Sequence, residues 1–141
     1  YGKTVTEEGI HKAYDMFEGI TAYVQRIMHD VFTETVTGGT ADVNLVDNMT
    51  DRFIEESSRR IREQLSVITE QQKELLYAIH SEGIAKGLTA SAFVKRHRLK
   101  SASSVQSATK QLLEMDLITK EGNEYTLSDP LLKLWLTREI Q

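Results

Sequence analysis

The first half of the chain shows apolar residues at the spacing of helix faces. Thr6 is the expected N-cap of a first helix, and Gly19 is expected to end it. Thr21 is the expected cap of a second helix. The predicted apolar face of the first helix is Ile10, Ala13, Tyr14 and Phe17. That of the second is Val24, Ile27, Met28, Val31 and Phe32.

A loop and two further helices are predicted before residue 67. The stretch 37–40, Thr-Gly-Gly-Thr, reads as a loop. A short helix is expected over 41–48 and a longer one over about 50–66. The apolar positions of the longer helix are Phe53, Ile54, Ile61 and Leu65. Its outer face carries charged residues mostly spaced as i, i+4 partners, which indicates a solvated surface: Glu55, Glu56, Arg59, Arg60 and Glu63.

The second half begins with a helix-start signal. Thr69 and Gln72 form a capping box, and Gly83 is expected to end the helix that follows. The inner face of this helix is Leu75, Leu76 and Ile79. A short helix carrying Phe93 and Val94 is expected next, capped by Thr89 or Ser91. A third helix should begin at Ser101, or at Ser103 with Gln106 completing a second capping box.

A hairpin and a final helix complete the pattern. Strands are predicted over 117–120 and 124–127, joined through Glu-Gly-Asn. Asp129 followed by Pro130 is a strong helix start, and the last helix carries Leu131, Leu134 and Trp135 as its apolar stripe. We therefore predict a mainly α fold: a helical, lid-like subdomain over 1–67, then a winged helix-turn-helix domain with one β-hairpin wing over 68–141.

Composition narrows the class of protein. Residues 1–68 hold seven Lys/Arg against twelve Asp/Glu, and residues 69–141 hold ten against nine. The second half is thus nearly neutral, whereas dedicated nucleic-acid binders usually have a clear basic excess. The chain has no cysteine, which excludes disulfides and fits the reducing cytoplasm. No apolar run is long enough for a membrane span. The first residue is Tyr1, so we expect a piece of a longer protein.

The polar face of the third helix suggests contact with DNA. Ser103, Ser107 and Lys110, flanked by Gln106, lie opposite the apolar side formed by Val105, Ala108 and Leu112. Short hydroxyls allow a helix to approach a groove closely, while Gln and Lys can bind base edges or phosphate. The alternative is a plain amphipathic helix whose polar face is only hydrated.

Basic residues before this helix, and one on the wing, complete the candidate DNA-binding set. The densest basic cluster is Lys95, Arg96, His97, Arg98 and Lys100. It lies where a helix-turn-helix crosses the phosphate backbone, although cations there also favour the dipole of the preceding helix. Arg96, Arg98 and Lys100 are its candidate DNA contacts. Lys120 and Asn123 on the wing are natural backbone contacts, but Glu121 and Glu124 beside them oppose this. These acids keep a protein partner open as an alternative.

No catalytic, cofactor-binding or metal-binding residues are predicted. The four histidines are scattered, with no pair at the i, i+4 spacing of a helical zinc site. The chain contains neither G-x-x-x-x-G-K-[ST] nor G-x-S-x-G. We therefore expect no enzymatic activity from this chain alone.

Several segments resemble the C-terminal lid and winged-helix region of archaeal-type P-loop ATPases of the AAA+/STAND group. Residues 19–25, GITAYVQ, resemble the lid motif, and residues 65–78, LSVITEQQKELLYA, resemble the start of the winged helix. Residues 99–113 and 125–136 resemble the rest of that domain. In the last segment Asp129 and Trp135 keep their places, while leucines replace the aromatic residues that relatives carry between them.

The resemblance implies a lid and winged-helix tail cut from a longer ATPase. Together with the candidate residues above, it leads us to expect a regulatory tail that binds DNA. ATP and Mg²⁺ would bind an upstream nucleotide domain, and that domain and double-stranded DNA would be the partners. Two other functions stay open: a winged helix that docks a protein, and a free-standing transcription regulator whose first half binds a ligand or dimerises. None of these functions implies that a membrane is a partner.

Overall fold

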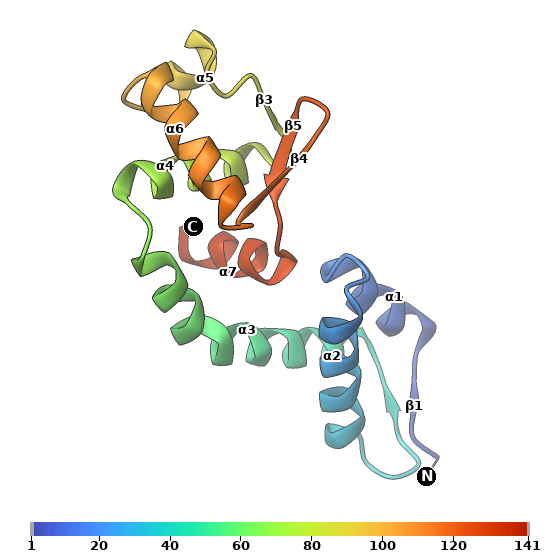
Figure 1. Cartoon of the computed structure of the whole chain (residues 1–141). Helices are drawn as coiled ribbons and strands as arrows, with labels where there is room; N and C mark the ends of the chain where they lie inside the picture. The colour runs from blue at the N-terminus through green and yellow to red at the C-terminus, as the bar shows by residue number, and fades with distance from the viewer. Residues whose placement is uncertain (1, 141) are drawn as a thin grey trace. The chain divides into compact units, whose positions relative to one another are not determined.

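The computed structural model describes residues 2–140, which divide along the chain into two compact units, the second beginning at Arg59. The division falls inside a long helix, α3, which runs over Val43–Ser66. The sequence-based boundary between residues 67 and 68 lies just beyond the end of this helix. Each unit has a hydrophobic core of its own, and Figure 1 colours the first blue to green and the second green to red.

The first unit combines three helices with a two-stranded parallel ribbon. Helices α1 (Glu7–Met16) and α2 (Thr21–Glu34) join the first part of α3. Strands β1 (Thr4–Val5) and β2 (Thr40–Ala41) pair in parallel. Three aromatic rings, those of Phe17, Tyr23 and Phe53, pack at centroid distances between 5.5 and 5.9 Å in the core.

The buried face of α1 differs from the predicted one. Thr6 does cap the helix, since its side chain accepts the Gly9 N–H. Ile10 and Tyr14, however, are 46% and 58% exposed, so the prediction that they face the core is wrong. Ala13 and Phe17 are buried as predicted, and Gly9 is also buried. A Cβ at residue 9 would lie 3.3 Å from Val46 Cγ2, so glycine permits this close approach.

The predicted apolar face of α2 is also only partly buried. Ile27 and Val31 are buried, but Phe32 is 47% exposed. The Lys3 ammonium lies 4.5 Å from its ring centroid. Thr21 is not the N-cap: Ile20 takes that position, with no side-chain hydrogen bond.

The two helices predicted over 41–48 and 50–66 are one continuous helix. In α3, Val46, Met49 and Phe53 maintain a buried face across the expected break at residue 49. Because these three side chains pack into the core from one face, the helix continues through residue 49. The predicted apolar positions from Phe53 to Leu65 are confirmed as buried.

The second unit is a winged helix. It contains α4 (Glu70–Glu82), α5 (Ser91–Arg96), α6 (Ala102–Glu114) and α7 (Pro130–Ile140). Strands β3 (Ala85–Lys86), β4 (Ile118–Glu121) and β5 (Glu124–Leu127) form an antiparallel sheet in the order β3-β5-β4. Figure 1 shows α6 leading directly into the β4–β5 hairpin. The predicted mainly α fold with one hairpin wing is confirmed, and β3 is an addition.

Local signals in this unit mostly act as expected. Thr69 and Gln72 form both hydrogen bonds of a capping box at α4. Asp129 accepts the Leu131 N–H at the start of α7. Leu131 and Trp135 are buried, whereas Leu134 is only half-buried. Neither predicted cap of α5 is right, because Ala90 is the N-cap and has no side-chain hydrogen bond.

Candidate nucleic-acid interface

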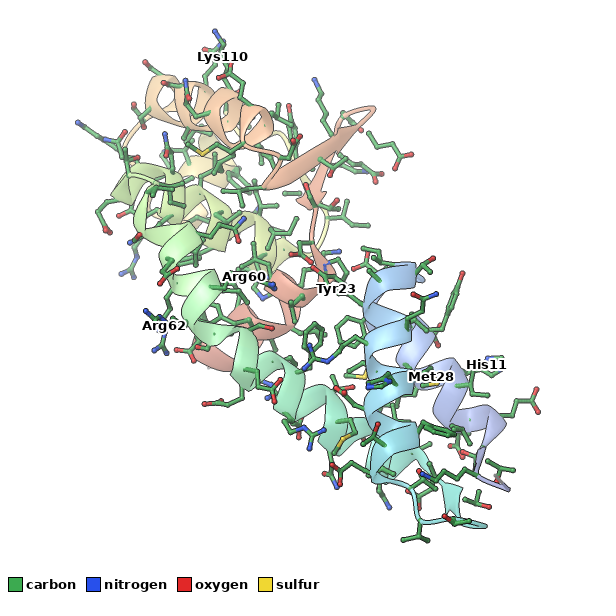
Figure 2. All side chains as sticks on the ribbon, turned by 60° about the horizontal axis from the view of Figure 1, so that its bottom comes forward. His11, Tyr23, Met28, Arg60, Arg62 and Lys110 are labelled. Atoms are coloured by element: carbon green, nitrogen blue, oxygen red, sulfur yellow. The ribbon has the colours of Figure 1, made fainter. Side chains whose placement is uncertain are left out.

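Helix α6 separates a buried face from a polar face that points to solvent. Val105, Ala108 and Leu112 are at most 4% exposed, as predicted. The opposite face carries the four polar candidates, and Figure 2 shows Lys110 extending away from the body of the winged unit. All four of these side chains are exposed: Ser103, Gln106, Ser107 and Lys110. The geometry fits a helix that presents polar groups to a partner.

The start of α6 is fixed by Ser101. Its hydroxyl accepts the Ser104 N–H at 3.1 Å, and the Ser104 hydroxyl accepts the Ser101 N–H at 3.2 Å. This reciprocal pair satisfies two of the amide groups that a helix N-terminus leaves unpaired. The alternative box formed by Ser103 and Gln106 is absent. Both of those side chains are therefore left out of capping and lie on the exposed surface.

The turn between α5 and α6 holds Arg98 in an unusual backbone conformation. Its φ is +54°, the left-handed region that favours glycine. The Arg98 and Leu99 N–H groups bond to the carbonyls of Lys95 and Val94, which is the Schellman pattern of a helix end. An arginine at this position is a strained choice with an exposed, cationic side chain. Lys100, two residues on, is also exposed.

Arg96 is less available than its neighbours. Its Nη2 lies 2.7 Å from Glu82 Oε1 at the end of α4, and His97 Nε2 lies 2.7 Å from the same oxygen. Since a carboxylate only accepts, the His97 proton in this bond is on Nε2. The His97 hydrogen bond, reinforced by the charge of Arg96, lowers the pKa of Glu82 against a smaller opposing effect of burial. Glu82 therefore stays ionised and holds both side chains.

The wing has two chemically different faces. Ile118 pairs with Leu127 and Lys120 with Tyr125, so these four side chains share the face that continues from the core. Glu121 pairs with Glu124 on the opposite face. The two wing acids thus lie on the side of the sheet away from Lys120. Glu124 also pairs with Lys86 of β3, at 3.6 Å.

A hollow of about 700 Å³ lies beside α6 on the Lys120 face of the wing. It gathers three of the predicted site residues, Ser103, Gln106 and Lys120. Arg98 and Lys100 lie in the turn before α6, and Ser107 and Lys110 lie on its outer face. The remaining lining is uncharged: Gly87, Leu88, Thr89, Ala102, Thr109, Gly122, Asn123 and Tyr125.

A charge pattern along the sequence marks the same surface. Residues 83–113, from the end of α4 almost to the end of α6, contain no Asp or Glu. The same stretch contains six basic residues: Lys86, Lys95, Arg96, Arg98, Lys100 and Lys110. The near-neutral balance of the whole second half conceals this segment, because its acids flank it on both sides. A windowed charge count would have added Lys86 to the candidates.

Other sites receive no support. Among residues 2–140, no cluster of three His, Asp or Glu side chains could hold a metal ion. In the first unit, the guanidinium of Arg26 on α2 forms ion pairs with Asp30, at 2.9 Å, and with Glu56, at 2.6 Å. These ion pairs account for its charge within the fold. Over the same residues, no helix has both the length and the apolar character required to cross a membrane.

Comparisons with known proteins agree with this description of the second unit. Over 94% of its length, the chain is similar in structure to the Walker-type ATPase Paby2304 of Pyrococcus abyssi, with a TM-score of 0.69 and 16% sequence identity. The chain spans 36% of that ATPase. No curated protein sequence matches the chain. The family described as "Probable winged helix domain" matches residues 60–138, more than half of the chain, which therefore belongs to that winged-helix family.

Proposed function

We propose that the chain is the regulatory winged-helix region of a P-loop ATPase and that its winged unit binds double-stranded DNA. The acid-free segment 83–113 is the observation that carries DNA binding. It contributes the turn with Arg98 and Lys100 and the exposed face of α6. Within the described residues, no carboxylate pairs with Arg98, Lys100 or Lys110, so these charges are available to phosphate.

In this mode α6 enters the major groove. Gln106 and Lys110 then reach base edges, with Ser103 and Ser107 allowing close approach. Arg98 and Lys100 bind phosphates before the helix, and Lys120 binds the flank from the wing. The two wing acids do not oppose this contact, because they occupy the other face of the hairpin.

Two observations support the proposal that this chain is part of a longer ATPase. They are the motif resemblance and the fold that the chain shares with part of a Walker-type ATPase. ATP and Mg²⁺ would bind the nucleotide domain elsewhere in the parent protein. Residues 1–141 contain no phosphate-loop motif, so no nucleotide contact is assigned to this chain. Its role would be to couple DNA contact to that domain.

A salt-dependent titration tests DNA binding. Fluorescence anisotropy with a labelled duplex should show binding at low salt that weakens as salt rises. Three cations assigned to phosphates, Arg98, Lys100 and Lys120, predict a slope of log affinity against log salt of about −3. Replacing Arg98 and Lys100 by Glu should abolish binding. An Arg60→Glu variant is the control, since Figure 2 shows Arg60 on α3 well separated from Lys110.

A protein partner is the second candidate function. The outer face of the wing favours it, because Glu121 and Glu124 lie side by side there and could receive a basic surface. Failure to bind any duplex at low salt, or binding unchanged in the Arg98/Lys100 variant, would favour this alternative.

A further inference from the structure

The hollow between α6 and the wing differs chemically from the convex face of α6. Its rim includes two carboxamides, those of Gln106 and Asn123, and the aromatic ring of Tyr125. It has one cation, Lys120, and no acid. This is an unusual lining for phosphate alone, because most of its polar groups are neutral donors and acceptors.

The sheet explains why the hollow is not filled. Near the base of the hairpin, Ile118 and Leu127 close the space between sheet and helix and are at most 3% exposed. Two residue pairs nearer the tip, Lys120 and Tyr125 occupy the same face. Opposite them, α6 presents Ser103 and Gln106, which are too polar or too short to complete an apolar core. The core-side surface therefore continues outward as an open concavity.

Glycines occur at two places on the rim. Gly87, in the turn after β3, has a φ of +59°, and Gly122, in the hairpin turn, has a φ of +63°. A Cβ at Gly122 would meet no atom within 4 Å, so the hairpin turn borders open space. A polymer could enter or leave past such a rim.

Tyr125, the carboxamides and Lys120 offer the three contacts that an unpaired nucleotide needs. Aromatic rings stack bases that are free of a duplex. Amide side chains pair with the Watson–Crick edge, which is accessible only when a base is unpaired. The Lys120 ammonium, 5.6 Å from the Tyr125 ring centroid, is placed for the adjoining phosphate. We propose that this hollow binds an unpaired nucleotide of a partly single-stranded DNA, an inference that rests on the proposed DNA binding.

The test compares two DNA probes on the 141-residue chain. One is a blunt duplex, and the other is the same duplex with a short single-stranded extension containing 2-aminopurine. We expect the chain to bind the extended probe about tenfold more tightly, the scale of a single stacking contact. Stacking on Tyr125 should also quench the 2-aminopurine fluorescence.

Three variants locate the effect. Tyr125→Leu should remove both the preference and the quenching while leaving blunt-duplex affinity unchanged, and Tyr125→Phe should retain them. Asn123→Ala, at an exposed turn position, should reduce the preference without a change in folding. Circular dichroism melting checks that each variant folds.

The outcomes separate this inference from the proposed function. Equal affinity for both probes, with Tyr125→Leu without effect, would overturn the nucleotide site and leave duplex binding intact. If a variant fails to fold, the wild-type preference and quenching still decide. Failure to bind either probe would overturn both proposals together.

Discussion

Arg96 Nη2 and Glu82 Oε1 lie 2.7 Å apart, and this contact links the end of α5 to the end of α4. The contact restrains Arg96, one of the three basic residues predicted to bind phosphate before α6. A surface ion pair of this kind adds little stability. Its larger consequence is electrostatic, because Glu82 reduces the charge that Arg96 can offer to a phosphate.

Removing this carboxylate should strengthen DNA binding. In Glu82→Gln, Arg96 regains an uncompensated charge, so the slope of log affinity against log salt should steepen by up to about 0.9. Anisotropy titrations over several salt concentrations measure this. Glu70→Gln, at the exposed start of α4, changes the net charge equally and is the control. The same gain in both variants would mean that only net charge matters.

Arg98 should show a conflict between stability and binding. Glycine fits its left-handed backbone better than arginine does, so Arg98→Gly should stabilise the fold by about 0.5 to 1 kcal/mol. The same change removes a phosphate contact and should weaken DNA binding. Urea unfolding and anisotropy measure the two effects. A variant that loses stability would show that the Arg98 side chain has a structural role instead.

Sequence patterns located the winged unit well because its signals are local. Capping at Thr69 and Asp129, the hairpin, and the buried face of α6 each depend on residues close in the chain. Strands β1, β2 and β3 were missed because each has two residues and exists only through a distant partner. No periodicity can appear in so short a segment.

Ser101 and Ser103 form a matched pair that separates capping from recognition. Ser101→Ala should cost about 1 kcal/mol, because it leaves amide groups at the start of α6 unpaired. Ser103→Ala should leave stability almost unchanged, since Ser103 is exposed and outside the capping box. Thermal and urea unfolding of the two variants measure this. Equal costs would mean that α6 begins elsewhere in solution.

The candidate site was only partly predictable for a related reason. The exposed face of α6 follows from helical periodicity, and its residues are where that pattern places them. The engagement of Arg96 by Glu82 depends on how α4 lies against α5, which spacing does not reveal. The two faces of the wing follow from strand register, since Glu121 pairs with Glu124. A prediction based on the charge of the wing as a whole does not distinguish them.

His80 should make the stability of the winged unit depend on pH. Burial, assisted by the nearby charge of Lys133, lowers its pKa below the ordinary value of 6.5. The unfolded chain therefore binds more protons than the folded one as pH falls through 6.5. Stability should be complete above that pH and decrease below it.

Urea unfolding at about pH 7.5 and about pH 5 measures this effect. His80→Gln should reduce the difference between the two midpoints, whereas His11→Gln, at an exposed position of the first unit, should not. Equal pH dependence in the wild type and in His80→Gln would assign the effect to other groups.

The last residues of α3 should belong to the winged unit. Ile61 and Leu65 are 3% and 4% exposed, and Arg62 lies 3.2 Å from Glu139 and 5.7 Å from the Trp135 ring. A fragment of residues 59–141 keeps these contacts, while a fragment of 68–141 begins at the sequence-based boundary and loses them. Two buried aliphatic side chains contribute about 1.5 to 3 kcal/mol each.

The longer fragment should therefore be more stable by about 3 kcal/mol or more, and the shorter one should expose Trp135. Urea denaturation followed by tryptophan fluorescence measures both, because Trp135 is the only tryptophan in the chain. A third protein is the longer fragment with Ile61→Ala and Leu65→Ala. It keeps the helix length but loses the two buried side chains, so it separates the effect of burial from that of helix length. Equal stability of all three would instead place the boundary of the folding unit after α3.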